Sequence, residues 1–585
     1  MTAAGARTEP AGGAAVRRVR EAYRRIEEAD RPEVWIGLRP RDEVEREAAE
    51  VDARRAAGAH LPLAGTVFAV KGNIDLAGLP TTAGCPSFAY LPAADAPAVA
   101  RLRAAGSVPL GTTNLDQFAT GLVGTRSPYG AVRGAVDPSR VSGGSSSGSA
   151  VAVALGLVDL ALGTDTAGSG RVPAAFNGVV GLKPTGGVVP TTGVVPACRS
   201  LDCVSVFARS VDAAELAYGI IADPVPVGPA PRRPGPWRIA VPPLEQLGEL
   251  DEGWPAAYLA AVDRLAAAGA EPAAIDLAPF GAVARMLYEG AFVAERYDAV
   301  GEFIEKQADA PDLDPVVRRI ITAGRDIPAH RLYRDLAELA RLRDIALAEL
   351  GEADALLLPT TPGHPTLAEV AADPVGANSR LGRFTNSTNL LGLCALAVPA
   401  GQVRGLPFGV MLIGRPHTES RLAVLARLLA APQVPAWVSA PGPVSAPTAA
   451  PTAAPPAVRL AVLGAHLTGQ PLNGQLLALG ATLAGTTRTA PDYRLYALDT
   501  APAKPGLVRV PSGGASVEAE VWELPAAGLG TLTAALPEPM AIGSVRLADG
   551  SRVAGFLCEP AALAGAEDIT GYGGWRGYLA ARDPS

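Results

Sequence analysis

Two glycine- and serine-rich stretches on either side of an apolar run constrain this chain more than any other feature. The stretches are residues 141–150, VSGGSSSGSA, and residues 163–171, GTDTAGSGR. Such composition is typical of a flexible linker, but residues 150–162 between them are almost continuously apolar and are interrupted only by Asp159. This run is too short for a membrane helix, which needs roughly 20 apolar residues. We therefore predict a glycine-rich loop that leads into a buried helix and strand.

Helical and strand patterns alternate through the first part of the chain. Residues 14–58 are rich in Ala, Arg and Glu and predict amphipathic helices with a break near Arg31. Residues 63–70 predict a short buried strand that delivers Lys71 into a turn, and residues 96–106 predict a helix before the next strand. This alternation indicates an α/β fold.

A proline- and alanine-rich segment divides the chain. Residues 436–457 carry a proline every few positions, which favours an extended spacer without a core of its own. We therefore assign residues 1–435 to a first domain and residues 458–585 to a second. Short apolar segments and the hairpin signal at Asp549 and Gly550 predict that the second domain is β-rich, of the α+β class.

The composition favours a protein that acts on small molecules in the cytoplasm. The net charge of −7 gives no basic surface for nucleic acid. The amino terminus lacks the apolar core of a signal peptide, and we expect no association with a membrane. The five cysteines form no CxxC pair, so we expect reduced thiols at Cys85, Cys198, Cys203, Cys394 and Cys558.

A lysine and two serines form a candidate catalytic set. The five histidines include no HxxxH or HxxH pair, so we expect neither a metal site nor another cofactor. A serine needs a base to become a nucleophile, and Lys71 is the available one because burial after an apolar strand would lower its pKa. We predict Ser169 as nucleophile, Lys71 as base and Ser145 as the hydroxyl that passes the proton between them. The alternative for Ser145 is an ordinary helix N-cap.

The turn before Ser169 is a candidate oxyanion hole. Its small residues allow backbone amides to point at a developing negative charge. The predicted donors are the amides of Thr166, Ala167 and Gly168, together with the amide of Ser169 itself.

These motifs resemble the amidase signature family. Lys71, residues 143–148 and residues 163–173 occur in the order that the family shows, and the two serines are 169 − 145 = 24 positions apart. The resemblance implies an α/β/α sandwich around a mixed sheet. It also implies a Ser, cis-Ser, Lys triad in which a cis peptide precedes Ser145.

The order of the whole chain resembles the allophanate hydrolase family. The resemblance rests on residues 461–473, 555–559 and 567–576 in the second domain, and it implies that Tyr288 and Arg296 hold allophanate. An arginine suits this small carboxylate ligand. Eight positions along a helix span about 12 Å, so both residues can reach one ligand only if their side chains converge or the helix is interrupted. The alternative for Arg296 is a solvated helix residue.

The resemblance implies a reaction and a partner. Allophanate would be hydrolysed to ammonia and N-carboxycarbamate, which then gives carbon dioxide and a second ammonia, as the last stage of urea degradation. The chain has neither a biotin-attachment motif nor a P-loop, so the biotin-dependent urea carboxylase that supplies allophanate would be a separate polypeptide. We expect a homodimer.

The second domain resembles the γ-glutamylcyclotransferase-like fold. The resemblance implies that His466 promotes decarboxylation of the first product, and a histidine can act as acid or base near neutral pH. A structural or an assembly role for His466 stays equally open.

Two other functions stay open for the whole chain. One is another amidase, such as a glutamine-transamidating enzyme, and the other is a non-catalytic scaffold that binds a small anion. A nucleotide site at the glycine-rich loop is disfavoured because no lysine follows the run.

Overall fold

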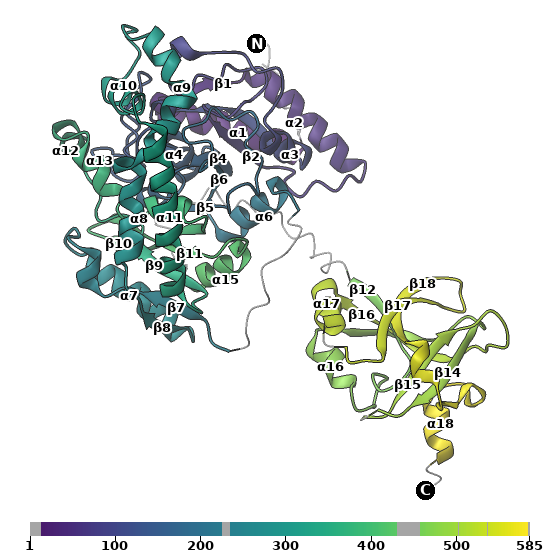
Figure 1. Cartoon of the computed structure of the whole chain (residues 1–585). Helices are drawn as coiled ribbons and strands as arrows, with labels where there is room; N and C mark the ends of the chain where they lie inside the picture. The colour runs from purple at the N-terminus through teal and green to yellow at the C-terminus, as the bar shows by residue number, and fades with distance from the viewer. Residues whose placement is uncertain (1–12, 225–234, 430–456, 501, 535, 583–585) are drawn as a thin grey trace, which may run out of the picture. The chain divides into compact units, whose positions relative to one another are not determined.

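The computed structural model describes residues 13–224, 235–429, 457–500, 502–534 and 536–582. The chain divides into two compact units, Met1–Val438 and Ser439–Ser585 (Figure 1). The predicted linker at residues 436–457 lies outside the described residues except for its last position, so the linker stays a prediction.

The first unit is built on one mixed sheet. Among its described residues, eleven strands follow the order β1-β3-β2-β4-β6-β5-β10-β11-β9-β7-β8. The parallel pairs β3/β2 and β2/β4 lie toward one end of the sheet, and β9/β7 and β7/β8 lie toward the other. The strands are β1 (Trp35–Leu38), β2 (Val67–Lys71), β3 (Val108–Thr113), β4 (Leu160–Asp165), β5 (Val180–Lys183), β6 (Cys203–Ala208), β7 (Arg238–Val241), β8 (Glu271–Ala274), β9 (Ala355–Pro359), β10 (Cys394–Val403) and β11 (Leu406–Gly414).

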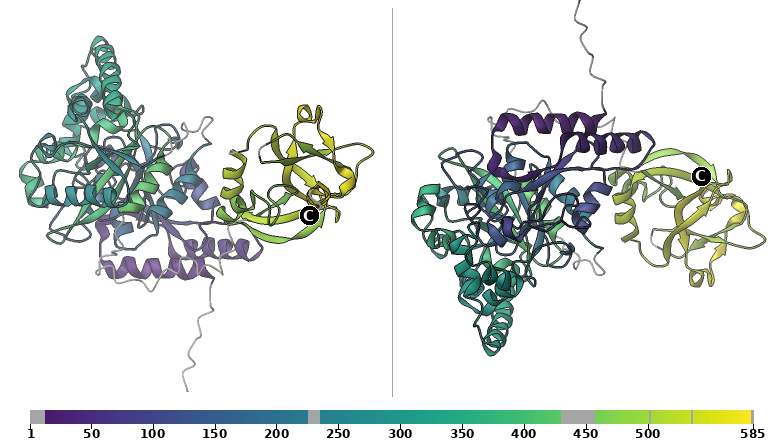
Figure 2. Two further views of the ribbon diagram at one scale, coloured as in Figure 1. Left: turned by 90° about the horizontal axis from the view of Figure 1, so that it is seen from below. Right: turned by 90° about the horizontal axis from the view of Figure 1, so that it is seen from above.

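Helices lie on both sides of this sheet. In both views of Figure 2 the purple helices α1 and α2 lie at one side of the unit, and the teal and green helices of residues 278–350 lie at the opposite side. The helices are α1 (Ala14–Ala29), α2 (Arg41–Ala56), α3 (Pro97–Ala104), α4 (Ser147–Ala154), α5 (Val172–Phe176), α6 (Val211–Ile221), α7 (Trp254–Ala267), α8 (Ala278–Glu289), α9 (Ala294–Lys306), α10 (Pro315–Thr322), α11 (Ala329–Leu350), α12 (Leu367–Ala372), α13 (Gly376–Leu381), α14 (Asn386–Leu390) and α15 (Glu419–Leu429). The predicted α/β fold around a mixed sheet is confirmed.

The burial of β2, β4 and α4 explains why the glycine-rich stretches are ordered. Every residue of β2, β4 and α4 is buried, which is typical of parallel strands that are covered on both faces. The loop before α4 and the turn after β4 are therefore held by a core that their own small side chains could not form. The predicted buried helix and strand are confirmed at α4 and β4.

The second unit has its own sheets and core. Its described strands form a five-stranded sheet of order β13-β16-β12-β18-β17 and a three-stranded sheet of order β15-β14-β19. Strands β17 and β18 pair as the hairpin that Asp549 and Gly550 predicted. The strands are β12 (Ala457–Val462), β13 (Thr482–Arg488), β14 (Tyr493–Leu498), β15 (Lys504–Arg509), β16 (Glu518–Pro525), β17 (Met540–Arg546), β18 (Arg552–Cys558) and β19 (Glu567–Asp568). The helices are α16 (Asn473–Ala478), α17 (Ala526–Ala534) and α18 (Trp575–Arg582).

Candidate active site

Strands β2 and β4 bring Lys71 beside the glycine-rich loop. The two strands are parallel neighbours, with Val70 opposite Leu162, so Lys71 at the end of β2 lies near Thr164 of β4. The Lys71 ammonium nitrogen Nζ lies 2.8 Å from Ser145 Oγ and 2.7 Å from Thr164 Oγ1. Lys71 and Ser145 are both 0% exposed.

The environment of Lys71 changes its charge. Burial lowers the pKa of this lysine from an ordinary value of 10.5 to about 7, although the carboxyl groups of Asp116, Asp202 and Asp165 act in the opposite direction. A large share of Lys71 is therefore a neutral amine near neutral pH, and a neutral amine can accept a proton.

The loop that carries Ser145 is hydrogen-bonded to the backbone of the buried residue Asp116. The peptide between Gly144 and Ser145 is cis, as the family resemblance implied. Asp116 accepts hydrogen bonds from the backbone amides of Val123, Gly124 and Arg126, and its own amide donates to the carbonyl oxygen of Ser145. The N-cap of α4 is Ser146, so Ser145 is not the helix cap that the alternative interpretation required.

A buried ion pair fixes the turn that carries Ser169. Arg171 donates from Nε and Nη2 to the two carboxylate oxygens of Asp165, each at 2.9 Å, and both side chains are 0% exposed. Burial alone would raise the pKa of Asp165, but Arg171 holds it below its usual range. Arg171 also donates to Thr388 Oγ1 and Asn389 Oδ1. The turn is thus tied to α14, more than 200 positions later in the chain.

The turn presents free backbone amides, but they differ in part from the prediction. The amide of Gly168 donates to Asp165 Oδ1 at 2.8 Å and is therefore not available to an oxyanion. Within the described residues, the amides of Thr166, Ala167 and Ser169 have no acceptor. Gly168 has a φ of +128°, and a Cβ there would lie 2.4 Å from Thr385 Oγ1, so only glycine suits this position.

Asp202 and Thr164 belong to the site although the sequence did not single them out. The Thr166 hydroxyl donates to Asp202 Oδ1 at 2.5 Å, and the amides of Ala197 and Cys198 donate to the same carboxyl group. Burial raises the pKa of Asp202. Thr164 could have been predicted, because it lies in the same glycine-rich motif as Ser169, five positions earlier. Asp202 lies outside the motifs, and no local pattern marks it as a site residue.

Tyr288 and Arg296 meet because the helix between them is interrupted. Helix α8 ends at Glu289 and α9 begins at Ala294. A Cβ at Gly290 would lie 2.5 Å from the carbonyl oxygen of Met286, so the break requires a glycine. Arg296 donates from Nη2 to the Tyr288 hydroxyl at 3.2 Å, and its guanidinium carbon lies 5.4 Å from the centre of the tyrosine ring.

Arg296 is a buried cation that forms no ion pair with a carboxylate in the described part of the chain. It is 1% exposed, and its other side-chain hydrogen bond goes from Nη1 to Thr120 Oγ1 at 3.0 Å. Burial acts to lower the pKa of Arg296, but the nearby Tyr288, Cys198 and Asp202 raise it overall, so the carboxyl group of Asp202 interacts with this cation without forming an ion pair. The alternative of a solvated helix residue is therefore wrong, because the side chain is enclosed.

His466 lies in the second unit, whereas the other predicted site residues lie in the first. Its ring stacks on Phe556 with centroids 4.7 Å apart, and its Nε2 lies 3.1 Å from Gln475 Oε1. Burial lowers the pKa of His466, and the nearby charge of Lys504 acts in the same direction.

Other site classes find no support in the described residues. Among them, no three His, Cys, Asp or Glu side chains cluster as metal ligands would. No described helix combines the length and apolar character that crossing a membrane requires.

Comparison with known families agrees with this geometry. The model of the family described as amidase matches residues 17–423. The chain belongs to the amidase family. A second model, of the allophanate hydrolase C-terminal domain, matches residues 458–580, so this amidase carries a C-terminal domain of that type.

Individual relatives extend the comparison. The chain is 44% identical over 545 residues to a urea amidolyase of Lachancea kluyveri, covering 89% of this amidase and 30% of that protein. It therefore spans about a third of the length of that relative. It is 37% identical to one component of a glutamyl-tRNA(Gln) amidotransferase of Symbiobacterium thermophilum, covering 66% of this chain and 86% of the other. The structure of Kluyveromyces lactis allophanate hydrolase is similar with a TM-score of 0.71 and 39% identity, covering 97% of both chains.

Proposed function

We propose that this amidase hydrolyses allophanate to ammonia and N-carboxycarbamate. The observation that narrows the substrate is Arg296, a buried guanidinium that has no carboxylate partner in the described residues and contacts Tyr288. A buried cation that no carboxylate contacts is costly, and the carboxylate of allophanate would supply that contact in addition to the more distant charge of Asp202. The similar proteins named urea amidolyase and allophanate hydrolase support the same substrate.

The proposed mechanism uses Ser169 as nucleophile and Lys71 as base. Neutral Lys71 takes the proton of Ser145, which takes the proton of Ser169 as its Oγ attacks the terminal amide carbon of allophanate. The free amides of Thr166 and Ala167 stabilise the oxyanion, with the amide of Ser169 beside them. Ammonia leaves with a proton returned along the same path, and water then hydrolyses the acyl-enzyme.

The first test is ammonia release from allophanate by the wild type and by Ser169→Ala. We expect turnover to be lost in the variant because the attacking oxygen is gone. Simple amides and glutamine are measured in parallel, since similarity to a component of an amidotransferase makes a glutamine-dependent amidase the second candidate. Faster turnover of glutamine than of allophanate would favour that candidate. Absence of any ammonia release from the wild type would favour a non-catalytic anion-binding scaffold.

We also propose that the second unit promotes decarboxylation of N-carboxycarbamate, with His466 as acid or base. Its ring is held by Phe556 and Gln475, which supports a defined position for proton transfer. The deciding measurement compares the rate of carbon dioxide release with and without residues 458–585. Equal rates would leave the unit a structural or assembly role only.

We also propose a compartment, a partner reaction and an oligomeric state for this protein. All five cysteines are free and buried, which supports a reducing compartment such as the cytoplasm. We propose that the protein works downstream of a separate biotin-dependent urea carboxylase and that it forms a homodimer. Sedimentation of the purified protein tests the dimer, and ammonia formation from urea, ATP and bicarbonate in the presence of both proteins tests the coupling.

A further inference from the structure

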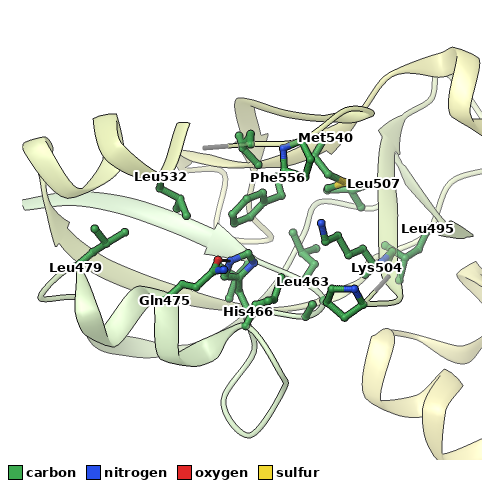
Figure 3. Close-up of a pocket in the computed structure, with 18 of the residues that line it drawn as sticks. Leu463, His466, Gln475, Leu479, Leu495, Lys504, Leu507, Leu532, Met540 and Phe556 are labelled. Carbon is green, nitrogen blue, oxygen red and sulfur yellow. Dashed lines mark hydrogen bonds between the residues drawn. The ribbon is translucent and has the colours of Figure 1, made fainter. Parts of the chain in front are cut away.

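The second unit contains a cavity of about 470 Å³ with mostly apolar walls. Figure 3 shows side chains from separate parts of the unit around it, including α16, α17 and the strands β14, β15 and β18. The apolar wall includes Leu463, Leu479, Leu495, Leu507, Leu532, Met540 and Phe556. No aspartate or glutamate is among the residues that line it in the described structure.

Lys504 is the charged group of this cavity. It is the first residue of β15 and is half-buried. Figure 3 shows its ammonium group directed into the cavity, toward the side where His466 and Phe556 lie. Within the described residues, this ammonium group forms no ion pair and no hydrogen bond. An ammonium group without a partner at an apolar wall can form a charge-assisted hydrogen bond with an anion that enters the cavity.

His466 occupies the same cavity in a fixed orientation. Its Nε2 faces the Gln475 carbonyl oxygen at 3.1 Å and its ring lies flat on Phe556. With Nε2 as the donor to Gln475, Nδ1 is the ring nitrogen that is free to exchange a proton. The cavity therefore combines one fixed charge, one group that can move a proton, and a large apolar wall.

We propose that Lys504 binds one carboxylate of N-carboxycarbamate and that the other carboxylate lies against the apolar wall, from which it leaves as carbon dioxide. This inference rests on the proposed decarboxylation in the second unit. The leaving carboxylate loses its hydration at the wall, whereas the neutral carbon dioxide that it becomes needs none. Lys504 keeps the ligand bound by the carboxylate that does not react.

The step balances without a cofactor. The bond between the leaving carboxyl carbon and nitrogen breaks, and its electron pair stays on nitrogen. Nδ1 of His466 first takes a proton from water and then gives it to this nitrogen, so the ring ends neutral as it began and hydroxide balances the charge. The products are carbon dioxide and carbamate, H₂NCOO⁻, which then releases the second ammonia.

The test follows ¹³C-labelled allophanate by NMR in the full-length protein, so that N-carboxycarbamate and its loss are seen separately. Lys504→Met removes the charge at a similar side-chain length, and Lys504→Arg keeps the charge. We expect Lys504→Met to lower the ratio of decarboxylation to amide hydrolysis by about tenfold, the worth of one charge-assisted hydrogen bond, and Lys504→Arg to restore most of it. Lys306→Met, on the exposed face of α9, is the matched control.

The possible failures are distinguishable. Suppose that Lys504→Met keeps the wild-type ratio of decarboxylation to amide hydrolysis, whereas removal of residues 458–585 lowers it. This result would overturn the assignment of Lys504 but not the role of the second unit. An unchanged ratio on removal of those residues would overturn the role of the second unit. No hydrolysis of allophanate by the wild type would overturn the proposed function itself.

Discussion

The two candidate sites of this chain are built in opposite ways. In the first unit, Lys71, Ser145, Asp165 and Arg171 are fully enclosed, and each has a hydrogen-bond or ion-pair partner. In the second unit, His466 and Lys504 are half-buried at the edge of an apolar cavity, and Gln475 is the side-chain hydrogen-bond partner of His466. Removing one member of a saturated buried network leaves its partners unsatisfied, so substitutions should cost far more in the first site than in the second.

The largest effect is expected for Lys71→Met. This change removes the proposed base and leaves the Ser145 hydroxyl without its hydrogen-bond partner Lys71 Nζ, so kcat for ammonia release should fall by roughly 10⁴-fold or more. Steady-state kinetics measure the loss, and circular dichroism confirms that the fold is kept. A decrease of less than tenfold would mean that another group serves as the base.

Asp165→Asn should destabilise the first unit by about 3 to 5 kcal/mol, because it leaves Arg171 as a buried cation without a carboxylate. Denaturation in urea, followed by tryptophan fluorescence, measures the change. The control is Asp42→Asn in the exposed ion pair between Asp42 and Arg46 on α2, which should be indistinguishable from the wild type. Similar urea denaturation curves for both variants would show that the buried ion pair of Asp165 contributes no more to stability than the exposed one.

Arg296→Ala should raise KM for allophanate by about 100-fold, with a smaller change in kcat, because a buried charge-assisted contact to the substrate is lost. The KM of Arg296→Lys should lie between those of the wild type and Arg296→Ala. One ammonium group cannot reach both Thr120 and Tyr288 as the planar guanidinium does. Arg319→Ala on the exposed face of α10 is the control. An unchanged KM in Arg296→Ala would refute the carboxylate contact.

The pH profile should show one acidic limb with a midpoint near 7. Lys71 must be neutral to accept a proton, and its pKa is about 7, so kcat/KM should fall about tenfold for each pH unit below that value. It should reach a plateau above pH 8. A midpoint near 10 would show that burial does not lower the pKa of this lysine.

The smallest effect is expected for Gln475→Leu in the second unit. The variant loses the hydrogen bond between His466 and residue 475 but keeps the stacking of the His466 ring on Phe556. Decarboxylation should therefore slow only about threefold. Ammonia release by the first unit should not change. A loss as large as that of Lys71→Met would remove the contrast between the two sites.

The sequence predicted the elements of the first site better than their contacts. Strand β2 and the pair α4 and β4 were predictable because their apolar runs are continuous and local. The contact between Lys71 and Thr164 depends on the parallel register of β2 and β4, which are about 90 positions apart, and no local pattern encodes it. The amide of Gly168 was misassigned because the carboxylate of Asp165, three positions earlier, accepts it, and such local hydrogen bonds from side chain to backbone compete with a role as a free donor.

The break between α8 and α9 at Gly290 bears on whether the proposed substrate preference can be transferred to another protein. Tyr288 and Arg296 touch because the backbone turns between α8 and α9; on an unbroken helix their backbones would be about 12 Å apart. The proposed selectivity for a small carboxylate would therefore depend on the path of the main chain as much as on two side chains. A tyrosine and an arginine at the same spacing on a continuous helix of another amidase should not confer this selectivity. Transfer of the whole segment from Ala278 to Lys306 should, because it contains both residues and the break between the helices.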